Sequence, residues 1–211
     1  MSGKAESGSA QAARGGSRAG VGWLRKLWFL HVMVGVCLVS ATAYAREPDG
    51  CQLRFPRSLA AAIEKRSPDH RLPRVADVPR RDRLAWIGRQ GGDECLLVAT
   101  GDFDGDGSLD IAAVLPARKG DTPILVAALY TRGTWNLTQL PFWDHTAARA
   151  YVNLLPPGAY HMTLSADHPL EAAERASFTS SRVGFVSGAM EATGVAYFAD
   201  QGAFVYIWIA S

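Results

Sequence analysis

The chain has 211 residues, of which 48% are hydrophobic and 20% are charged, a composition that suits one globular domain with additional segments. Its formal net charge is +2 at pH 7, but residues 1–45 contain five Lys or Arg residues and one acid. Residues 46–211 therefore carry 17 basic and 19 acidic side chains, and this net charge of −2 argues against nucleic-acid binding.

The N-terminal part of the chain has the pattern of a secretory signal. A stretch rich in Ser, Gly and Ala comes first, and Arg25 and Lys26 then precede the apolar segment LWFLHVMVGVCLVSATAYA. That segment is short for a membrane span and ends in a small-x-small triplet, as signal-peptide cleavage sites do. We therefore predict an N-terminal extension and signal peptide over residues 1–45, with cleavage after Ala45.

Cleavage at this point leaves residues 46–211 as one exported domain, periplasmic or secreted, with no membrane span. The Ala- and Arg-rich leader is typical of a bacterial protein. Two alternatives remain open: the apolar segment stays attached as an N-terminal anchor, or translation begins after Met1.

Two cysteines remain in the exported domain. They are Cys51 and Cys95, because Cys37 is removed with the signal peptide. An even number of cysteines in an oxidising compartment predicts a disulfide, worth about 4 kcal/mol in the chain-entropy model. The alternative is a pair of buried thiols. Neither cysteine belongs to a CxxC motif, so a zinc or redox site is not indicated.

Two helices are expected at the start of the exported domain. Residues 57–66 have helical spacing of apolar side chains, with Ser58 as a possible cap. A second helix is expected over residues 77–90, with Asp77 as N-cap and a Gly-Gly pair after it.

Strand patterns follow from Cys95 to the end of the chain. Turn signals at residues 131–134 and 200–202 predict two hairpins, and residues 167–176 are a candidate for one more short helix. The strand segments are CLLVATG, LDIAAVL, TPILVAALY, WNLTQL, AYHMTLS, VGFVSGAMEATGVAYFA and AFVYIWIAS. We predict an α+β fold: two N-terminal helices followed by a mainly antiparallel sheet of about five to seven strands.

The segment between the first two predicted strands is acidic, with the spacing D-x-D-x-D-G-x-x-D. Ca²⁺ prefers six to eight oxygen ligands, and alternate carboxylates in a tight loop can supply them. The predicted metal ligands are Asp102, Asp104, Asp106, the backbone carbonyl of Ser108, and Asp110. Gly107 would allow the sharp turn, and the apolar Leu109 is expected to hold the loop against the core.

The loop does not fit an EF-hand. Ala113 stands where an EF-hand has a bidentate Glu, and the flanking segments have strand patterns. We therefore predict a strand–loop–strand site that holds a structural Ca²⁺. The alternative is an acidic hairpin turn without an ion, because Asp and Gly are common in turns.

The segment GDFDGDGSLDIAAVL resembles the calcium-binding motif of FG-GAP and VCBS-type repeats, which occur in extracellular proteins including integrin-like propellers. The resemblance covers residues 101–115 and implies calcium binding by the same five residues. One copy cannot form a propeller of about four blades or more, so a propeller is not expected. The segment GFVSGAMEATGVAYFADQGAFVYIWIAS also resembles small exported bacterial proteins of unassigned function, which implies no activity.

No catalytic site is recognisable. Asp144 and His145 are adjacent, and adjacent residues rarely orient each other as a catalytic dyad does. His161 and His168 are interpreted as structural. Three acids could supply a carboxylate pair for hydrolysis, but the sequence cannot bring them together: Glu171, Glu174 and Glu191.

The last predicted hairpin is rich in aromatic residues. These are Tyr197, Phe198, Phe204, Tyr206 and Trp208. Alternation along the strands favours one buried and one exposed face, and the alternative is a face that recognises a protein, peptide or glycan. We therefore predict an exported, calcium-stabilised binding or accessory module in preference to an enzyme. The alternative is a periplasmic or secreted hydrolase with a site assembled from dispersed residues.

Overall fold

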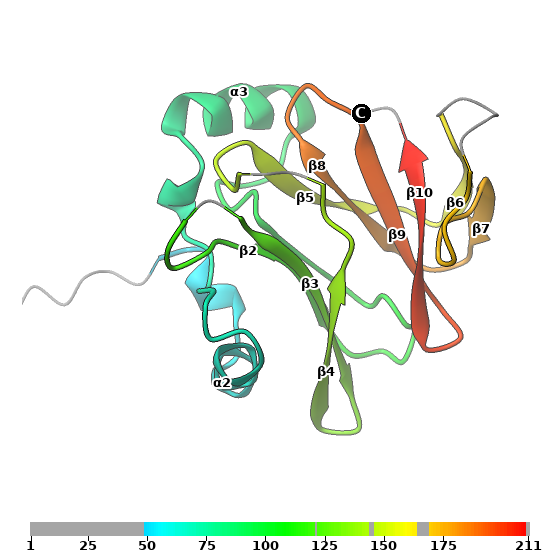
Figure 1. Ribbon diagram of the computed structural model, residues 1–211, viewed down its shortest axis with the longest axis horizontal. Helices are drawn as coiled ribbons and strands as arrows, with labels where there is room; N and C mark the ends of the chain where they lie inside the picture. The colour runs from blue at the N-terminus through cyan, green and yellow to red at the C-terminus, as the bar shows by residue number, and fades with distance from the viewer. Residues whose placement is uncertain (1–48, 121, 144–145, 164–168, 210–211) are drawn as a thin grey trace, which may run out of the picture. The chain divides into compact units, whose positions relative to one another are not determined.

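The computed structural model of the protein describes residues 49–120, 122–143, 146–163 and 169–209 (Figure 1). They belong to one unit of the chain, residues 47–211. The predicted signal peptide and its cleavage after Ala45 lie outside the described residues. Within the described part of the chain, no helix is long and apolar enough to cross a membrane.

The first α-helix, α2 (Arg57–Arg66), follows the short 3₁₀ helix η1 (Gln52–Arg54) and spans the residues that its pattern predicts. Leu59 and Ile63 lie one turn apart and are its buried side chains. Ser58 does not cap the helix. Its hydroxyl instead accepts a hydrogen bond from the Trp135 indole at 3.1 Å, so α2 is tied to the sheet that it covers.

The second α-helix, α3 (Arg80–Gln90), begins later than predicted. Asp77 is the last residue of the 3₁₀ helix η2 (Val75–Asp77), and its carboxylate accepts hydrogen bonds of 2.6 and 2.8 Å from the Arg71 guanidinium. The carboxylate is therefore engaged with Arg71 and does not cap α3. Gly91 ends the helix at φ +73°, a conformation that glycine adopts readily.

Ten strands in three antiparallel sheets make up most of the regular secondary structure of the described chain. One sheet has the order β1-β2-β3-β4, a second has the order β10-β9-β8-β5, and β6 pairs with β7. The strands are β1 (Val98–Gly101), β2 (Asp110–Leu115), β3 (Ile124–Thr131), β4 (Thr134–Leu140), β5 (Ala150–Leu155), β6 (Gly158–His161), β7 (Ser177–Ser180), β8 (Gly184–Ala189), β9 (Gly194–Asp200) and β10 (Ala203–Ile209).

The predicted α+β fold with one main sheet is wrong, because the described chain is mostly β and its few short helices all lie within residues 52–90. Strands β5 and β7 were not predicted: β5 lacks a clean alternation of burial, and β7 is a four-residue segment, SFTS, with three hydroxyl side chains. The long segment predicted as the first arm of the last hairpin, VGFVSGAMEATGVAYFA, forms two strands, β8 and β9.

The helix predicted over residues 167–176 is also not formed in its described part, 169–176. Here Glu174 makes a parallel bridge to Tyr206 of β10, and the backbone N–H of Tyr206 donates to the carbonyl of Ala173 at 3.0 Å. The segment therefore completes a sheet edge, where an extended backbone satisfies more hydrogen bonds than a single helical turn would.

The two four-stranded sheets share a hydrophobic core. Along β2, Ala112 and Val114 face this shared core, while Ile111, Ala113 and Leu115 face a second cluster that includes Leu59 and Ile63 of α2. Every residue of β2 is buried as a result. The sheets also adjoin through the backbone, because Val152 N–H donates to the Leu96 carbonyl at 2.7 Å.

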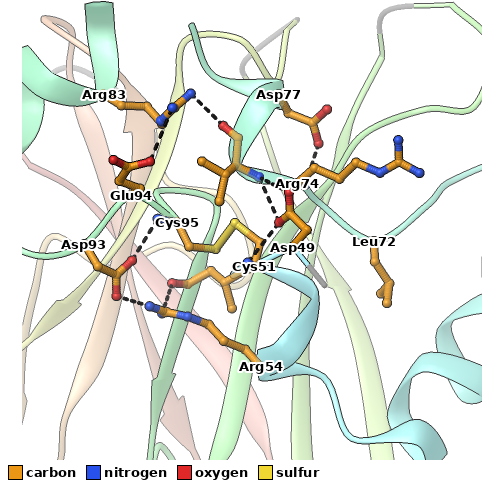
Figure 2. The surroundings of a disulfide bond; sticks show 12 residues. Asp49, Cys51, Arg54, Leu72, Arg74, Asp77, Arg83, Asp93, Glu94 and Cys95 are labelled. Carbon is orange, nitrogen blue, oxygen red and sulfur yellow. Dashed lines mark hydrogen bonds and ion pairs between the residues drawn. A yellow bond between two sulfur atoms is a disulfide. The ribbon is translucent and has the colours of Figure 1, made fainter. Parts of the chain in front are cut away.

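Cys51 and Cys95 form a disulfide, with 5.1 Å between their Cα atoms (Figure 2). Each cysteine is preceded two residues earlier by an aspartate whose carboxylate accepts the cysteine N–H: Asp49 at 3.0 Å and Asp93 at 2.8 Å. Asp93 also forms an ion pair with Arg54. The disulfide therefore joins the start of the described chain to the residues just before β1.

Candidate metal centre

The acidic loop connects β1 to β2, and three of its carboxylates converge. One carboxylate oxygen from each of Asp102, Asp104 and Asp106 lies within 4.8 Å of the others. Asp102 and Asp104 are half-buried, and Asp106 is exposed. The alternate positions of the three aspartates in the turn bring them to one side of it.

Backbone N–H groups hold the loop in this shape. Asp102 accepts hydrogen bonds from the N–H groups of Gly105 (2.8 Å) and Gly107 (3.0 Å). Asp104 accepts from Asp106 N–H at 3.1 Å, and Asp106 accepts from Ser108 N–H at 2.8 Å. Both glycines have positive φ, +79° and +86°, so the turn needs residues without a β-carbon at these positions.

Asp110 does not join the three converging carboxylates. Its side chain is fully buried, and its two oxygens accept the backbone N–H groups of Phe103 and Tyr130, each at 2.8 Å. Burial raises the pKa of this carboxyl to about 6, although the two backbone hydrogen bonds act in the opposite direction. The buried carboxylate of Asp110 thus joins the loop to Tyr130 of β3.

Phe103, which the sequence reasoning did not single out, anchors the loop. It is 1% exposed and packs on Phe185 of β8, with 5.0 Å between the ring centroids. Leu109, expected to fill this role, is 70% exposed. The alternation of Phe103 with the aspartates was the available signal: an aromatic residue between two outward-facing acids has to point the other way.

The converging carboxylates suit a hard cation. None of the ion pairs among the described residues involves Asp102, Asp104 or Asp106. Within the described part of the chain, no Lys, Arg or His side chain forms an ion pair with these three carboxylates. Oxygen ligands of this kind are those that Ca²⁺ and Mg²⁺ prefer. The chain supplies three carboxylates for such an ion, while Ser108 takes part in the loop through its N–H.

A cavity of about 580 Å³ adjoins the loop. Residues of β3, β4, β7 and the β9–β10 turn line it, and most of their side chains carry hydroxyl, amide or charged groups. Asp104 belongs both to the acidic loop and to the cavity wall, and its carboxylate lies 3.4 Å from the Thr131 hydroxyl. Arg182 also lines the cavity and lies against the loop itself, because a β-carbon added to Gly105 would lie 2.8 Å from its Nε.

The other acids considered for catalysis are only partly brought together. The Tyr206 hydroxyl donates to Glu171 at 2.7 Å, and Glu171 N–H donates to the Glu174 carboxylate at 3.1 Å. Burial raises the pKa of the Tyr206 hydroxyl, and the bond to Glu171 adds to this shift. Glu191 lies in the β8–β9 turn, 3.3 Å from Arg89.

The predicted histidines do not converge with these acids in the described chain. His161 is exposed on β6 and His70 makes a bridge to Ala117. Asp144, His145 and His168 lie outside the described residues.

The aromatic hairpin β9–β10 is buried on both faces, which corrects the expectation of one exposed face. Tyr197, Phe204 and Tyr206 belong to the core between the sheets, while Phe198 packs on Tyr160 and Phe178 of the β6–β7 pair. Trp208 is half-buried and contacts Trp143, with 4.5 Å between ring centroids. The hairpin therefore offers core packing in place of a broad recognition face.

The chain matches no known family model, no curated protein and no solved structure.

Proposed function

We propose that residues 46–211 form an exported binding or accessory module stabilised by calcium, without a catalytic site. The observation that carries the proposal is the convergence of three carboxylates, with no cationic partner among the described residues, on the loop between β1 and β2. The resemblance of this loop to FG-GAP and VCBS-type motifs belongs to the same proposal.

Asp102, Asp104 and Asp106 would hold the ion. A bound Ca²⁺ would offset the repulsion among the three carboxylates. The Asp102 carboxylate holds the turn closed by accepting two backbone N–H groups of the loop. The Asp110 carboxylate joins the turn to β3 by accepting the Tyr130 N–H. The expected effect of the ion is therefore stabilisation of the β1–β2 hairpin.

The binding role is supported by the cavity beside the loop. Its volume of about 580 Å³ is within the range of ligand sites, and its wall includes Asn136, Thr138, Arg182 and Asp200. Because Asp104 lies in both the loop and the wall, ion binding would order one side of the cavity. The Cys51–Cys95 disulfide supports export, since such bonds persist in oxidising compartments.

Thermal melting of the purified protein, with excess calcium and then with chelator, tests the calcium part of the proposal. Calcium at 100 times its dissociation constant adds about 2.7 kcal/mol, which raises Tm by about 5–10 °C for a domain of this size. Asp104→Asn should abolish the shift, whereas Asp69→Asn, an exposed acid on another loop, should keep it. A Tm that is equal in calcium and chelator would refute the calcium part.

A further inference from the structure

Strand β4 has a free edge. It pairs with β3 alone and is the outermost strand of its sheet (Figure 1). The outer side of β10, by contrast, is covered, because Arg175 N–H donates to the Tyr206 carbonyl at 2.9 Å and Tyr206 N–H donates to Ala173. No described residue makes a backbone hydrogen bond of this kind to the outer side of β4. Such an edge can accept a further strand.

The turn before β4 determines which backbone groups point outward. Arg132 and Gly133 both have positive φ, +52° and +82°, as in a type I′ turn. In such a hairpin Thr131 and Thr134 form the hydrogen-bonded pair that closes the turn. Alternate residues therefore direct their N–H and C=O groups to the free edge: Trp135, Leu137 and Gln139.

Hollows lie on both faces of this edge. The cavity described above includes Asn136 and Thr138 on one face. A second hollow of about 640 Å³, on the face that α2 covers, includes Trp135 and Leu137 together with Ala62, Lys65 and Arg66, and Asn136 lines both hollows. Side chains of a strand alternate between its two faces, so an added strand would direct successive side chains into the two hollows in turn.

The two hollows differ in charge. Lys65 and Arg66 are exposed and form no ion pair with any described residue, while their neighbour Glu64 is paired with Arg118 at 3.1 Å. The hollow beside α2 is therefore positive. The other hollow combines Asp104 and Asp200 with Arg182 and several hydroxyl groups, which suits neutral polar side chains.

We propose that the edge of β4 binds an extended peptide as an additional strand, with acidic side chains at alternate positions directed to Lys65 and Arg66. The inference rests on the proposed binding role and names its class of partner. Backbone hydrogen bonds to Leu137 and Gln139 would supply affinity, and the positive hollow would supply selection for Asp or Glu.

Selection from a displayed library of random linear peptides, against the purified protein, tests this inference. Selected peptides should carry Asp or Glu at alternate positions, and Lys65→Glu combined with Arg66→Glu should abolish their binding. Gln139→Pro should weaken binding about fivefold or more, the change expected when one backbone hydrogen bond is lost, while Gln139→Thr should not. Proline is tolerated at an edge position whose N–H faces outward, so the variant should fold.

Hydrogen exchange gives a second measurement that needs no variant. A selected peptide should slow exchange of the Leu137 and Gln139 amides. The inference would be overturned if the selection yields no binding peptide or if Gln139→Pro leaves peptide binding unchanged. It would also be overturned if a bound peptide does not slow amide exchange in β4. A dimer of this chain that dissociates on Gln139→Pro would assign the edge to a second copy and would equally overturn it. If the protein binds a selected peptide but its Tm is the same in calcium and in chelator, the calcium proposal is refuted and the peptide inference stands.

Discussion

The buried carboxylate of Asp110 accepts the backbone N–H of Phe103 at 2.8 Å, which joins the last acid of the motif to the aromatic anchor of the same loop. The motif is thereby divided in two. Asp102, Asp104 and Asp106 converge on the outside of the turn, where a cation can reach them. Asp110 faces inward and closes the turn against the core.

This division predicts different effects for two substitutions in one motif. Asp110→Ala removes the acceptor of one buried and one partly buried N–H group and should lower the free energy of unfolding by about 2–5 kcal/mol, in calcium and in chelator alike. Asp106→Ala removes an exposed acid and one exposed hydrogen bond, and should lower the free energy of unfolding much more in calcium than in chelator. Denaturant unfolding of both variants under both conditions checks this. Equal calcium dependence of the two effects would contradict the division.

The buried position of Asp110 also predicts a pH dependence. Burial raises its pKa from 3.8 to about 6 in the folded protein, so the folded state holds the proton more tightly than the unfolded chain does. The stabilisation from this proton is fully present below the unfolded pKa and is lost as the pH rises through about 6. In chelator, the stability of the wild type relative to Asp110→Asn should therefore increase as the pH falls from about 6 to about 4.

Denaturant unfolding of the two proteins across this range measures the difference directly. The two proteins differ at residue 110 alone, so the difference between their stabilities reports on Asp110. A difference that stays constant, or that decreases toward low pH, would show that the proton on Asp110 does not stabilise the folded state.

Phe103 should contribute more to stability than any other apolar side chain of the loop. Phe103→Ala removes a ring that is 1% exposed and packed on Phe185, and it should cost about 3–5 kcal/mol. Leu109→Ala is the matched control, because Leu109 is 70% exposed and its loss should change stability by less than about 0.5 kcal/mol. If Leu109→Ala lowers the free energy of unfolding by more than Phe103→Ala does in chemical denaturation, Leu109 is the anchor of the loop and this account is contradicted.

The disulfide should contribute about 4 kcal/mol. It joins cysteines 44 residues apart and so restricts the unfolded chain over a long loop. The double variant Cys51→Ser and Cys95→Ser should lose this amount in denaturant unfolding, and a reducing agent should have the same effect on the wild type but none on the double variant. A wild-type protein that alkylates at two thiols without prior reduction would contradict the pairing.

The sequence predicted the local features whose physical cause is local. The helix over residues 57–66 follows from the spacing of Leu59 and Ile63, and the hairpin turns follow from glycines that need positive φ. The Cys51–Cys95 pair followed from the number of cysteines and the expected compartment. These features depend on few residues, each with a strong preference.

Features that depend on distant neighbours could not be predicted in this way. Strand β7 is recognisable only through its partner β6 and through the contact of Phe178 with Phe198. The inward direction of Asp110 depends on Tyr130, twenty residues later, whose N–H it accepts. The mostly β fold was not predicted because strands such as β5 are stabilised by pairing with a neighbouring strand. The pattern of residues within one segment does not reveal that pairing.

Calorimetric titration of the metal-free protein with Ca²⁺ tests the central claim most directly, because it measures the binding of the ion and its stoichiometry. The account predicts one bound Ca²⁺ per chain, abolished by Asp104→Asn and retained by Asp69→Asn. The absence of saturable binding, or binding that survives Asp104→Asn unchanged, would contradict it and would leave the loop as an acidic turn held by its own backbone.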